Sequence, residues 1–168
     1  MIADAIRLFL FPALMAFAAS SDLLTMTISN RLPIALTAGF FLLALITGMN
    51  PYAIGMHIAA AVVVLAVAFA FFSQGWIGGG DAKLAAATVL WFGFDHLLDY
   101  VIYASLFGGA LTLAILQFRR LPLPGLFARQ AWISRLHDRA GGVPYGIALA
   151  AAALIVYSKT GWMPGFGL

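Results

Sequence analysis

The sequence contains no cysteine among its 168 residues, which excludes disulfide bonds, thiolate catalysis and cysteine-ligated metal sites. Glutamate is absent too, so every acidic residue is an aspartate. Charge of either sign is scarce, because Asp, Glu, Lys and Arg together supply only 9% of the residues. Carboxylate chemistry therefore rests on a short list of aspartates, namely Asp4, Asp22, Asp81, Asp95, Asp99 and Asp138.

Apolar residues dominate the rest of the chain. They make up 64% of it, and the mean hydropathy is +1.02, which excludes an ordinary soluble globular protein and predicts an integral membrane protein. The net charge of +3 comes mostly from arginines in one loop, as membrane topology requires, so we expect no nucleic-acid partner. Because no repeat or low-complexity tract is visible, we expect residues 1–168 to form a single domain.

The hydrophobic segments predict an all-α, polytopic membrane protein. A spanning helix needs about 20 mostly apolar residues, with a range of roughly 17 to 25. Six segments are candidates for transmembrane helices, and they cover residues 4–21, 32–47, 52–72, 80–94, 97–118 and 143–157. The fourth is short for a full crossing, so we expect it to be tilted, recessed or flanked by a locally thinned bilayer.

The positive charges predict the orientation of these six helices. Six crossings place both termini on one side and the loops at 22–31, 73–83 and 119–142 on the other. Only Arg7 and Lys159 lie on the side of the termini. The remaining cations lie in or beside the three loops, and they are Arg31, Lys83, Arg119, Arg120, Arg129, Arg135 and Arg139. The positive-inside rule therefore predicts that these loops face the cytoplasm.

Residues 1–20 have a second interpretation as a secretory signal peptide. Small residues at 16–20 offer a plausible cleavage site. However, Asp4 offsets Arg7 and leaves no basic region before the apolar stretch. We therefore expect a retained first helix.

Two aspartates are expected at the same cytoplasmic boundary. Asp22 closes the first predicted helix, and Asp81 opens the fourth. Acids near membrane depth usually face a protein interior or a water-filled cavity and mark function. Two nearby carboxylates repel, so one keeps its proton and the pair contains an acid and a base at once. Taken singly, each aspartate is equally typical of a helix terminus in a solvated turn.

The glycines before Asp81 fit the same hypothesis. Gly78, Gly79 and Gly80 have no side chains, so a substrate strand can approach the backbone closely. Their N–H groups lie beside a helix start, where the helix dipole favours a carboxylate. We expect Lys83 to anchor this helix at the headgroups.

Three short motifs resemble those of a known family. The segment GGGDAK at 78–83 resembles the GxGD signature of membrane aspartyl proteases. Asp22 followed by ISN at 28–30 resembles the D-x5-I-P-N pattern of the type IV prepilin peptidases, and VPYG at 143–146 resembles their P-Y-G element. The motifs occur in family order over nearly the whole chain. The resemblance is closest to the short, single-domain members associated with tight-adherence (Flp) pili.

This resemblance implies an aspartic endopeptidase in which Asp22 and Asp81 are the catalytic pair. The implied substrate is a pilin precursor, cut at the cytoplasmic face of the bacterial inner membrane between a basic leader and a hydrophobic segment. No cofactor or metal is required. The motif residues expected to bind substrate are Gly78, Gly79, Gly80, Asn30, Pro144, Tyr145 and Gly146. Tyr145 has an alternative place in the interfacial aromatic belt.

The sequence departs from the family pattern at two points. Ser29 stands where the family usually has proline, so the turn after Asp22 is expected to be less rigid. Longer members also methylate the new terminus and carry a cysteine-containing insertion after the first helix. This chain has only a short loop there, so methyltransferase activity is not implied.

Other polar and small residues carry weaker predictions. Asp95 and Asp99 are expected in a solvated external turn. Gly108 and Gly109 are expected to permit close helix packing. The histidines are expected too far apart to share a metal, and they are His57, His96 and His137.

The largest loop, 119–142, includes a basic and weakly amphipathic stretch at 127–140. One interpretation places it on the cytoplasmic leaflet with Trp132, Ile133 and Leu136 turned toward lipid. The other is a plain basic loop. Its charge would repel a basic leader, so we assign it no role in leader recognition.

Two other functions remain open from the sequence. A small proton-coupled transporter or channel would use the membrane aspartates as an ion relay. A non-enzymatic subunit of a secretion apparatus would tolerate replacement of both aspartates. The sequence also leaves open whether the protein forms a homo-oligomer.

Overall fold

The structure, a computed structural model, describes residues 2–163 and is all-helical over that range. Those residues form eight helices: α1 Ile2–Thr25, α2 Arg31–Ile46, α3 Pro51–Ser73, α4 Gly79–Phe92, α5 Leu97–Phe118, α6 Gly125–Ala128, α7 Ala131–His137 and α8 Tyr145–Tyr157. The prediction of an all-α protein is confirmed. Each of the six predicted segments overlaps one of the helices α1 to α5 and α8.

Three stretches of the described helices are long and apolar enough to cross a membrane, and they are Ile6–Thr25, Pro51–Ser73 and Leu97–Phe118. The helices α2, α4 and α8 have 16, 14 and 13 residues. These are fewer than the roughly 20 residues that a full crossing needs. Helix length and composition therefore support three of the six predicted crossings.

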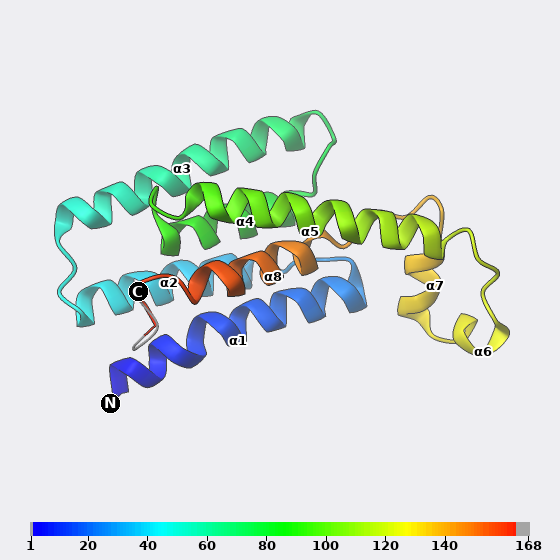
Figure 1. Cartoon of the computed structure of the whole chain (residues 1–168), viewed down its shortest axis with the longest axis horizontal. Coiled ribbons are helices and arrows are strands. Elements are labelled where there is room, and N and C mark those ends of the chain that lie inside the picture. The colour runs from blue at the N-terminus through cyan, green and yellow to red at the C-terminus, as the bar shows by residue number, and fades with distance from the viewer. Residues whose placement is uncertain (1, 164–168) are drawn as a thin grey trace.

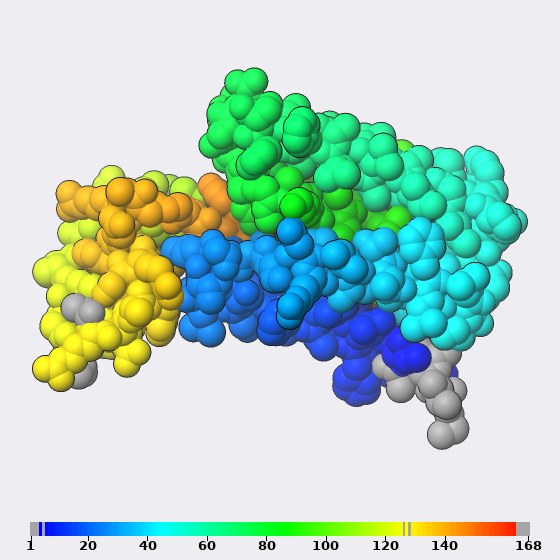
Figure 2. All heavy atoms as spheres, turned by 180° about the vertical axis from the view of Figure 1, so that it is seen from behind, coloured from blue at the N-terminus to red at the C-terminus, as the bar shows by residue number. Residues whose placement is uncertain are grey.

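The helices run side by side along the longest axis of the molecule (Figure 1). Helix α4 packs against α2, α3, α5 and α8, while α1 packs against α2 and α8. The start of α1 and the end of α8 lie at one end of the bundle, which we call the terminal end. Helices α6 and α7 project beyond the opposite end, which we call the loop end (Figures 1 and 2).

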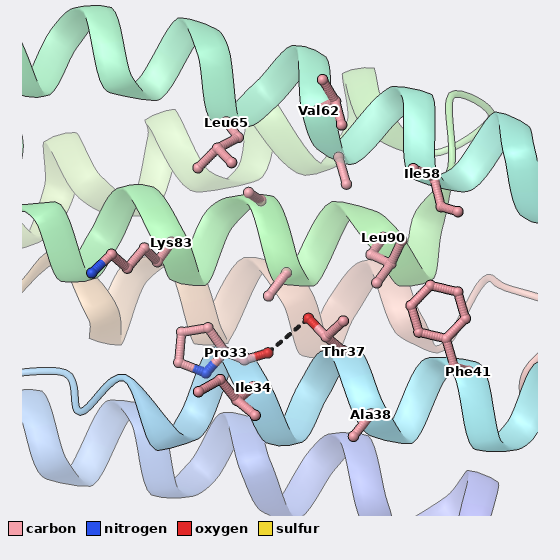
Figure 3. A pocket seen from close by; sticks show the side chains of 13 residues that line it. Pro33, Ile34, Thr37, Ala38, Phe41, Ile58, Val62, Leu65, Lys83 and Leu90 are labelled. Carbon is pink, nitrogen blue, oxygen red and sulfur yellow. Dashed lines mark hydrogen bonds between the residues drawn. The ribbon is translucent and has the colours of Figure 1, made fainter.

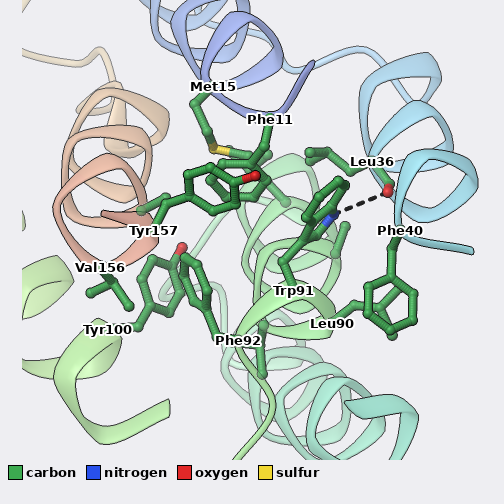
Figure 4. Packing of buried hydrophobic residues seen from close by; sticks show 14 of the residues in the cluster. Phe11, Met15, Leu36, Phe40, Leu90, Trp91, Phe92, Tyr100, Val156 and Tyr157 are labelled. Carbon is green, nitrogen blue, oxygen red and sulfur yellow. Dashed lines mark hydrogen bonds between the residues drawn. The ribbon is translucent and has the colours of Figure 1, made fainter. Parts of the chain in front are cut away.

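Aromatic rings fill the core near the terminal end (Figure 4). Phe11 stacks on Tyr157 with ring centroids 4.3 Å apart and packs against Trp91 at 5.0 Å. The Trp91 Nε1–H donates to the Leu36 carbonyl at 3.1 Å, so the indole is buried without losing its hydrogen bond. The Trp162 Nε1–H donates to the Trp91 carbonyl at 2.8 Å. This aromatic cluster joins α1, α2, α4 and α8.

Local signals set the helix ends on either side of this cluster. At the start of α3, Asn50 Oδ1 accepts a hydrogen bond from the Tyr52 N–H at 2.8 Å, and Pro51 occupies the first helical position. At the end of α4, Gly93 has a φ of +62°, which favours glycine and stops the helix. The chain then reverses into α5 within a few residues.

The loop at 119–142 folds against the bundle. The guanidinium of Arg119 is buried, and it donates to the Leu136 carbonyl at 2.8 Å and to the Gly142 carbonyl at 2.7 Å. Arg135 donates to the Leu24 carbonyl at the end of α1. The prediction that Leu136 faces lipid is therefore wrong, because these bonds hold the loop against the helices and bury that side chain. The other two apolar side chains of the predicted lipid face are partly buried.

The two glycines of α5 differ in their surroundings. Gly108 is buried, and a Cβ atom there would lie 3.5 Å from the Tyr145 ring. Gly109 is exposed, and a Cβ atom there would meet nothing within 4 Å. The prediction of close packing therefore holds for Gly108 and is wrong for Gly109.

The polar residues of the terminal end lie apart from the loop end. His57 Nδ1 donates to the Leu90 carbonyl at 2.8 Å. His57 and His96 line a cavity of about 340 Å³ together with Asp95. Asp99 lies 3.7 Å from Lys159 in a half-exposed ion pair. Among the described residues, no group of three His, Cys, Asp or Glu side chains is arranged to hold a metal ion.

Candidate active site

Asp22 lies in the last turn of α1 and is 5% exposed. The predicted end of the first helix at residue 21 is too early, because α1 continues to Thr25 and stops where Met26 adopts a positive φ of 55°. Asp22 Oδ2 accepts a hydrogen bond of 2.7 Å from the backbone N–H of Gly146. That N–H belongs to the first turn of α8, where helices leave donors unpaired. The start of α8 therefore holds a carboxylate of α1.

Asp81 is the third residue of α4, and its side chain is partly buried. Gly78 is the N-cap of that helix, and its N–H donates to the Asp81 carboxylate. This is half of a capping box, in which an acid in the first turn bonds back to the N-cap backbone. A Cβ atom on Gly78 would lie 2.8 Å from Asp81 Oδ2, so this carboxylate position requires glycine at 78.

Ile28 joins the two halves of the site. Its Cβ lies 3.1 Å from where a Cβ on Gly80 would be, and its Cδ1 lies 2.9 Å from where a Cβ on Gly146 would be. The two glycines therefore let one isoleucine pack against the starts of both α4 and α8. Asp22 and Asp81 are close enough to interact electrostatically. Residues remote in the sequence thus converge at the loop end of the bundle.

The other predicted site residues lie around this centre. Lys83 Nζ donates to Asn30 Oδ1 at 2.9 Å, a contact that the sequence did not predict. Asn30 precedes α2, so this bond ties α4 to the loop that carries Ile28. A Cβ on Gly79 would lie 3.3 Å from the ring of Phe72, which places Gly79 against α3.

Tyr145 packs against α5. Its hydroxyl is hydrogen-bonded to Thr112 Oγ1 at 3.1 Å, and its ring faces Gly108 on α5. Pro144 is buried as the residue that precedes α8. The part of the P-Y-G motif that reaches Asp22 is therefore the Gly146 backbone.

Two contacts around the candidate site could not be predicted from single residues. The packing of Ile28 between Gly80 and Gly146 depends on three separate segments, although the isoleucine itself stands in a recognised motif. The role of Arg119 was also missed, because its charge was counted as a cation of the cytoplasmic face. Its buried position is fixed by hydrogen bonds to the Leu136 and Gly142 carbonyls, and no sequence pattern predicts these bonds.

The comparisons with known proteins identify the family of the chain. Residues 9–113 match the type IV leader peptidase family, a range that includes Asp22, Ile28 and Asp81 and ends before the VPYG motif at 143–146. No curated protein and no solved structure matches the chain. Since the family match covers more than half of the sequence, the chain belongs to the type IV leader peptidase family.

Proposed function

We propose that this protein is a membrane aspartic endopeptidase that cleaves the leader from prepilins of the tight-adherence (Flp) type. Asp22 and Asp81 are the catalytic residues in this proposal. The observation that carries it is that Asp22 of α1 and Asp81 of α4, remote in sequence, lie near enough to interact electrostatically in a member of a leader peptidase family. The family match does not favour the transporter or channel alternative.

The proposed chemistry is hydrolysis by one water molecule. Since two negative charges at close range repel, the pair holds one proton between its carboxyl groups. The ionised carboxylate takes a proton from water, the hydroxide adds to the substrate carbonyl carbon, and the protonated carboxyl donates to the carbonyl oxygen. When the C–N bond breaks, the leaving amine receives the proton that the first aspartate took from water. The other aspartate takes a proton back from a hydroxyl of the tetrahedral intermediate, so the pair is again singly protonated.

The backbone contacts support this chemistry by fixing the two carboxylates. Asp22 is held by the Gly146 N–H, and Asp81 by the Gly78 N–H. Both donors belong to helix starts, where partial positive charge stabilises a carboxylate. Such preset positions reduce the reorganisation needed to reach the transition state.

We further propose that α1 to α5 and α8 all cross the membrane. At 1.5 Å per residue, α4 and α8 are only about 20 Å long, against a hydrocarbon core of about 30 Å. Both helices begin at the proposed catalytic pair. Loops fill the rest of the membrane thickness on that side. Non-helical backbone is tolerated at this depth where it lines a water-filled space. In this proposal, the water molecule used in hydrolysis reaches the carboxylates from the side of these loops.

The charge distribution supports a cytoplasmic site. The loop end carries Arg31, Arg120, Arg129, Arg135 and Arg139, whereas Arg7 and Lys159 lie at the terminal end. Arg119 is buried and Lys83 is bonded to Asn30, so neither is counted here. The loop end still carries more positive charge than the terminal end. By the positive-inside rule, the loop end and both carboxylates face the cytoplasm.

The proposal is tested by co-expressing the protein with a tight-adherence prepilin and measuring precursor and product masses. Asp22→Asn and Asp81→Asn preserve side-chain size but remove the ionisable proton, so each variant should leave the precursor uncut. Asp95→Asn, at the terminal end, is the matched control and should process it fully. Complete processing by either of the first two variants would refute the catalytic pair.

A further inference from the structure

An apolar groove of about 560 Å³ opens between α2 and α3 (Figure 3). Helix α4 forms its floor with Ala86, Ala87 and Leu90, and side chains such as Ile34 on α2 and Leu65 on α3 form its walls. Lys83 stands at the end of the groove nearest the start of α4.

The few polar groups of the groove already have partners within the protein. Thr37 Oγ1 donates to the Pro33 carbonyl at 2.8 Å, and Lys83 Nζ donates to Asn30 Oδ1 at 2.9 Å. The apolar walls therefore offer an occupant few hydrogen bonds. A polypeptide fits such a surface only as a helix, because a helix satisfies its own backbone groups.

Small side chains allow a helix to approach closely. Ala86 and Ala87 are buried on the floor, and Ala38 and Ala61 lie on the two walls. In a membrane, helices associate through close packing across small residues rather than through the hydrophobic effect. The alanines therefore supply the type of surface on which an apolar helix packs.

The Lys83 end of the groove and Asp81 lie at nearly the same depth on opposite faces of α4. Lys83 follows Asp81 by two residues, which corresponds to about 3 Å along the axis and about 200° around it. A chain leaving the groove reaches Asp81 by crossing the start of α4, where the helix begins with glycine. A helix is about 10 Å wide and an extended residue covers about 3.3 Å, so roughly three residues make this crossing.

From these features we infer that the groove docks the hydrophobic segment of the substrate as a helix, with the scissile bond about three extended residues before it. This inference rests on the proposed function, and it adds the surface that selects the substrate. The competing occupant is a lipid acyl chain, which also fills apolar grooves.

The absence of cysteine from the chain allows a clean cross-linking test. Ala38→Cys is combined with Asp22→Asn, so that the precursor stays uncut, and single cysteines are placed along the hydrophobic segment of a co-expressed prepilin. Disulfide formation should recur every three to four residues of the precursor, as expected for one face of a helix. Ala110→Cys, on an exposed part of α5, is the matched control and should give no such pattern.

Cross-linking that is absent at residue 38, or no stronger there than at residue 110, overturns docking in the groove. If the wild-type protein cuts the precursor and no periodic cross-link forms, only the groove inference fails. If periodic cross-links form but the wild-type protein never cuts, docking stands and the proposed peptidase function fails.

Filling the groove provides a second test that does not depend on cross-linking. Ala61→Phe places a ring in the space that the substrate helix would occupy, so KM should rise about 10-fold while kcat stays near the wild-type value. Ala110→Phe should leave both constants unchanged. An unchanged KM for Ala61→Phe would contradict substrate docking and indicate a lipid in the groove.

Discussion

The two ends of the helical bundle are held together by different interactions. At the terminal end, large rings interlock, as in the stack of Phe11 on Tyr157, and the indole nitrogen of Trp91 bonds to a neighbouring helix. At the loop end, glycines let Ile28 pack on two helix starts, and backbone N–H groups hold the carboxylates of Asp22 and Asp81.

The terminal end therefore mainly stabilises the fold, and the loop end mainly positions the two carboxyl groups. Buried rings contribute most of their free energy by packing, and they do so with no chemistry nearby. The glycine contacts instead fix the positions of the Asp22 and Asp81 carboxyl groups. Changes at the terminal end should therefore lower the free energy of unfolding, and changes at the loop end should lower the cleavage rate.

Phe11→Ala should have the largest effect on stability. It removes a ring that contacts both Tyr157 and Trp91, and such a truncation costs about 3 to 5 kcal/mol. Thermal or denaturant unfolding in detergent measures the loss. The fraction that remains folded should cut prepilin with a kcat close to that of the wild-type protein. A large fall in kcat at unchanged stability would contradict the separation of the two ends.

Gly146→Ala should have the reverse effect. Its Cβ would lie 2.8 Å from Asp22 Oδ2 and 2.9 Å from Ile28 Cδ1, so the carboxylate must move. A displacement of about 1 Å in a catalytic group can cost about 100-fold in rate. The measured quantity is kcat on a co-expressed or purified prepilin.

Gly109→Ala is the matched control for this variant. A Cβ there would meet nothing within 4 Å, and alanine favours a helix, so activity should not fall. Equal losses of activity in the two variants would show that glycine is not needed beside Asp22.

Trp91→Phe should cause a smaller change at the terminal end. It keeps an aromatic ring but loses the 3.1 Å hydrogen bond to Leu36 and leaves that carbonyl without this donor. We expect a loss of about 1 to 3 kcal/mol in unfolding free energy, measured as for Phe11→Ala. A gain in stability would indicate that the indole nitrogen is not a stabilising contact.

Lys83→Met should have the smallest effect of the series. The exposed contact between Lys83 and Asn30 ties the Ile28 loop to α4, and exposed contacts of this kind contribute less than about 1 kcal/mol, or about five-fold in rate. Asn30→Ala should give the same modest fall in kcat, and the double variant should be no worse than either. If the two losses of kcat add in the double variant, Lys83 and Asn30 do not act through their mutual contact.

The helices were the most predictable part of the fold. Long apolar runs fixed α3 and α5 to within about a residue, because hydrocarbon thickness sets their length. The end of α1 was placed too early, since Ser21 and Asp22 are typical of a helix terminus, yet Gly146 supplies a partner that lets the helix continue. The short helices α6 and α7 were not predicted as helices, although α7 lies in the weakly amphipathic stretch at 127–140, because helices of one or two turns depend on tertiary contacts for their stability.

The candidate site was predictable in its residues but not in its contacts. Topology and motifs brought Asp22 and Asp81 to one boundary, because the end of the first predicted helix and the start of the fourth fall on the same side when successive helices alternate in direction. The bond from Gly146 to Asp22 joins residues 124 apart, and the hydroxyl of Tyr145 finds its partner in Thr112 of another helix. Such contacts depend on how the helices pack, which a short stretch of sequence does not predict.

The central claim is that Asp22 and Asp81 act as one catalytic unit. Its most direct test compares kcat for wild type, Asp22→Asn, Asp81→Asn and the double variant, with enzyme in excess of prepilin so that slow cleavage is measured. If the pair shares one reaction, each single change should lower the rate by about 100-fold or more, and the double variant should be no slower than the slower single variant. Losses that multiply in the double variant, or a single variant that cuts at the wild-type rate, would contradict the account.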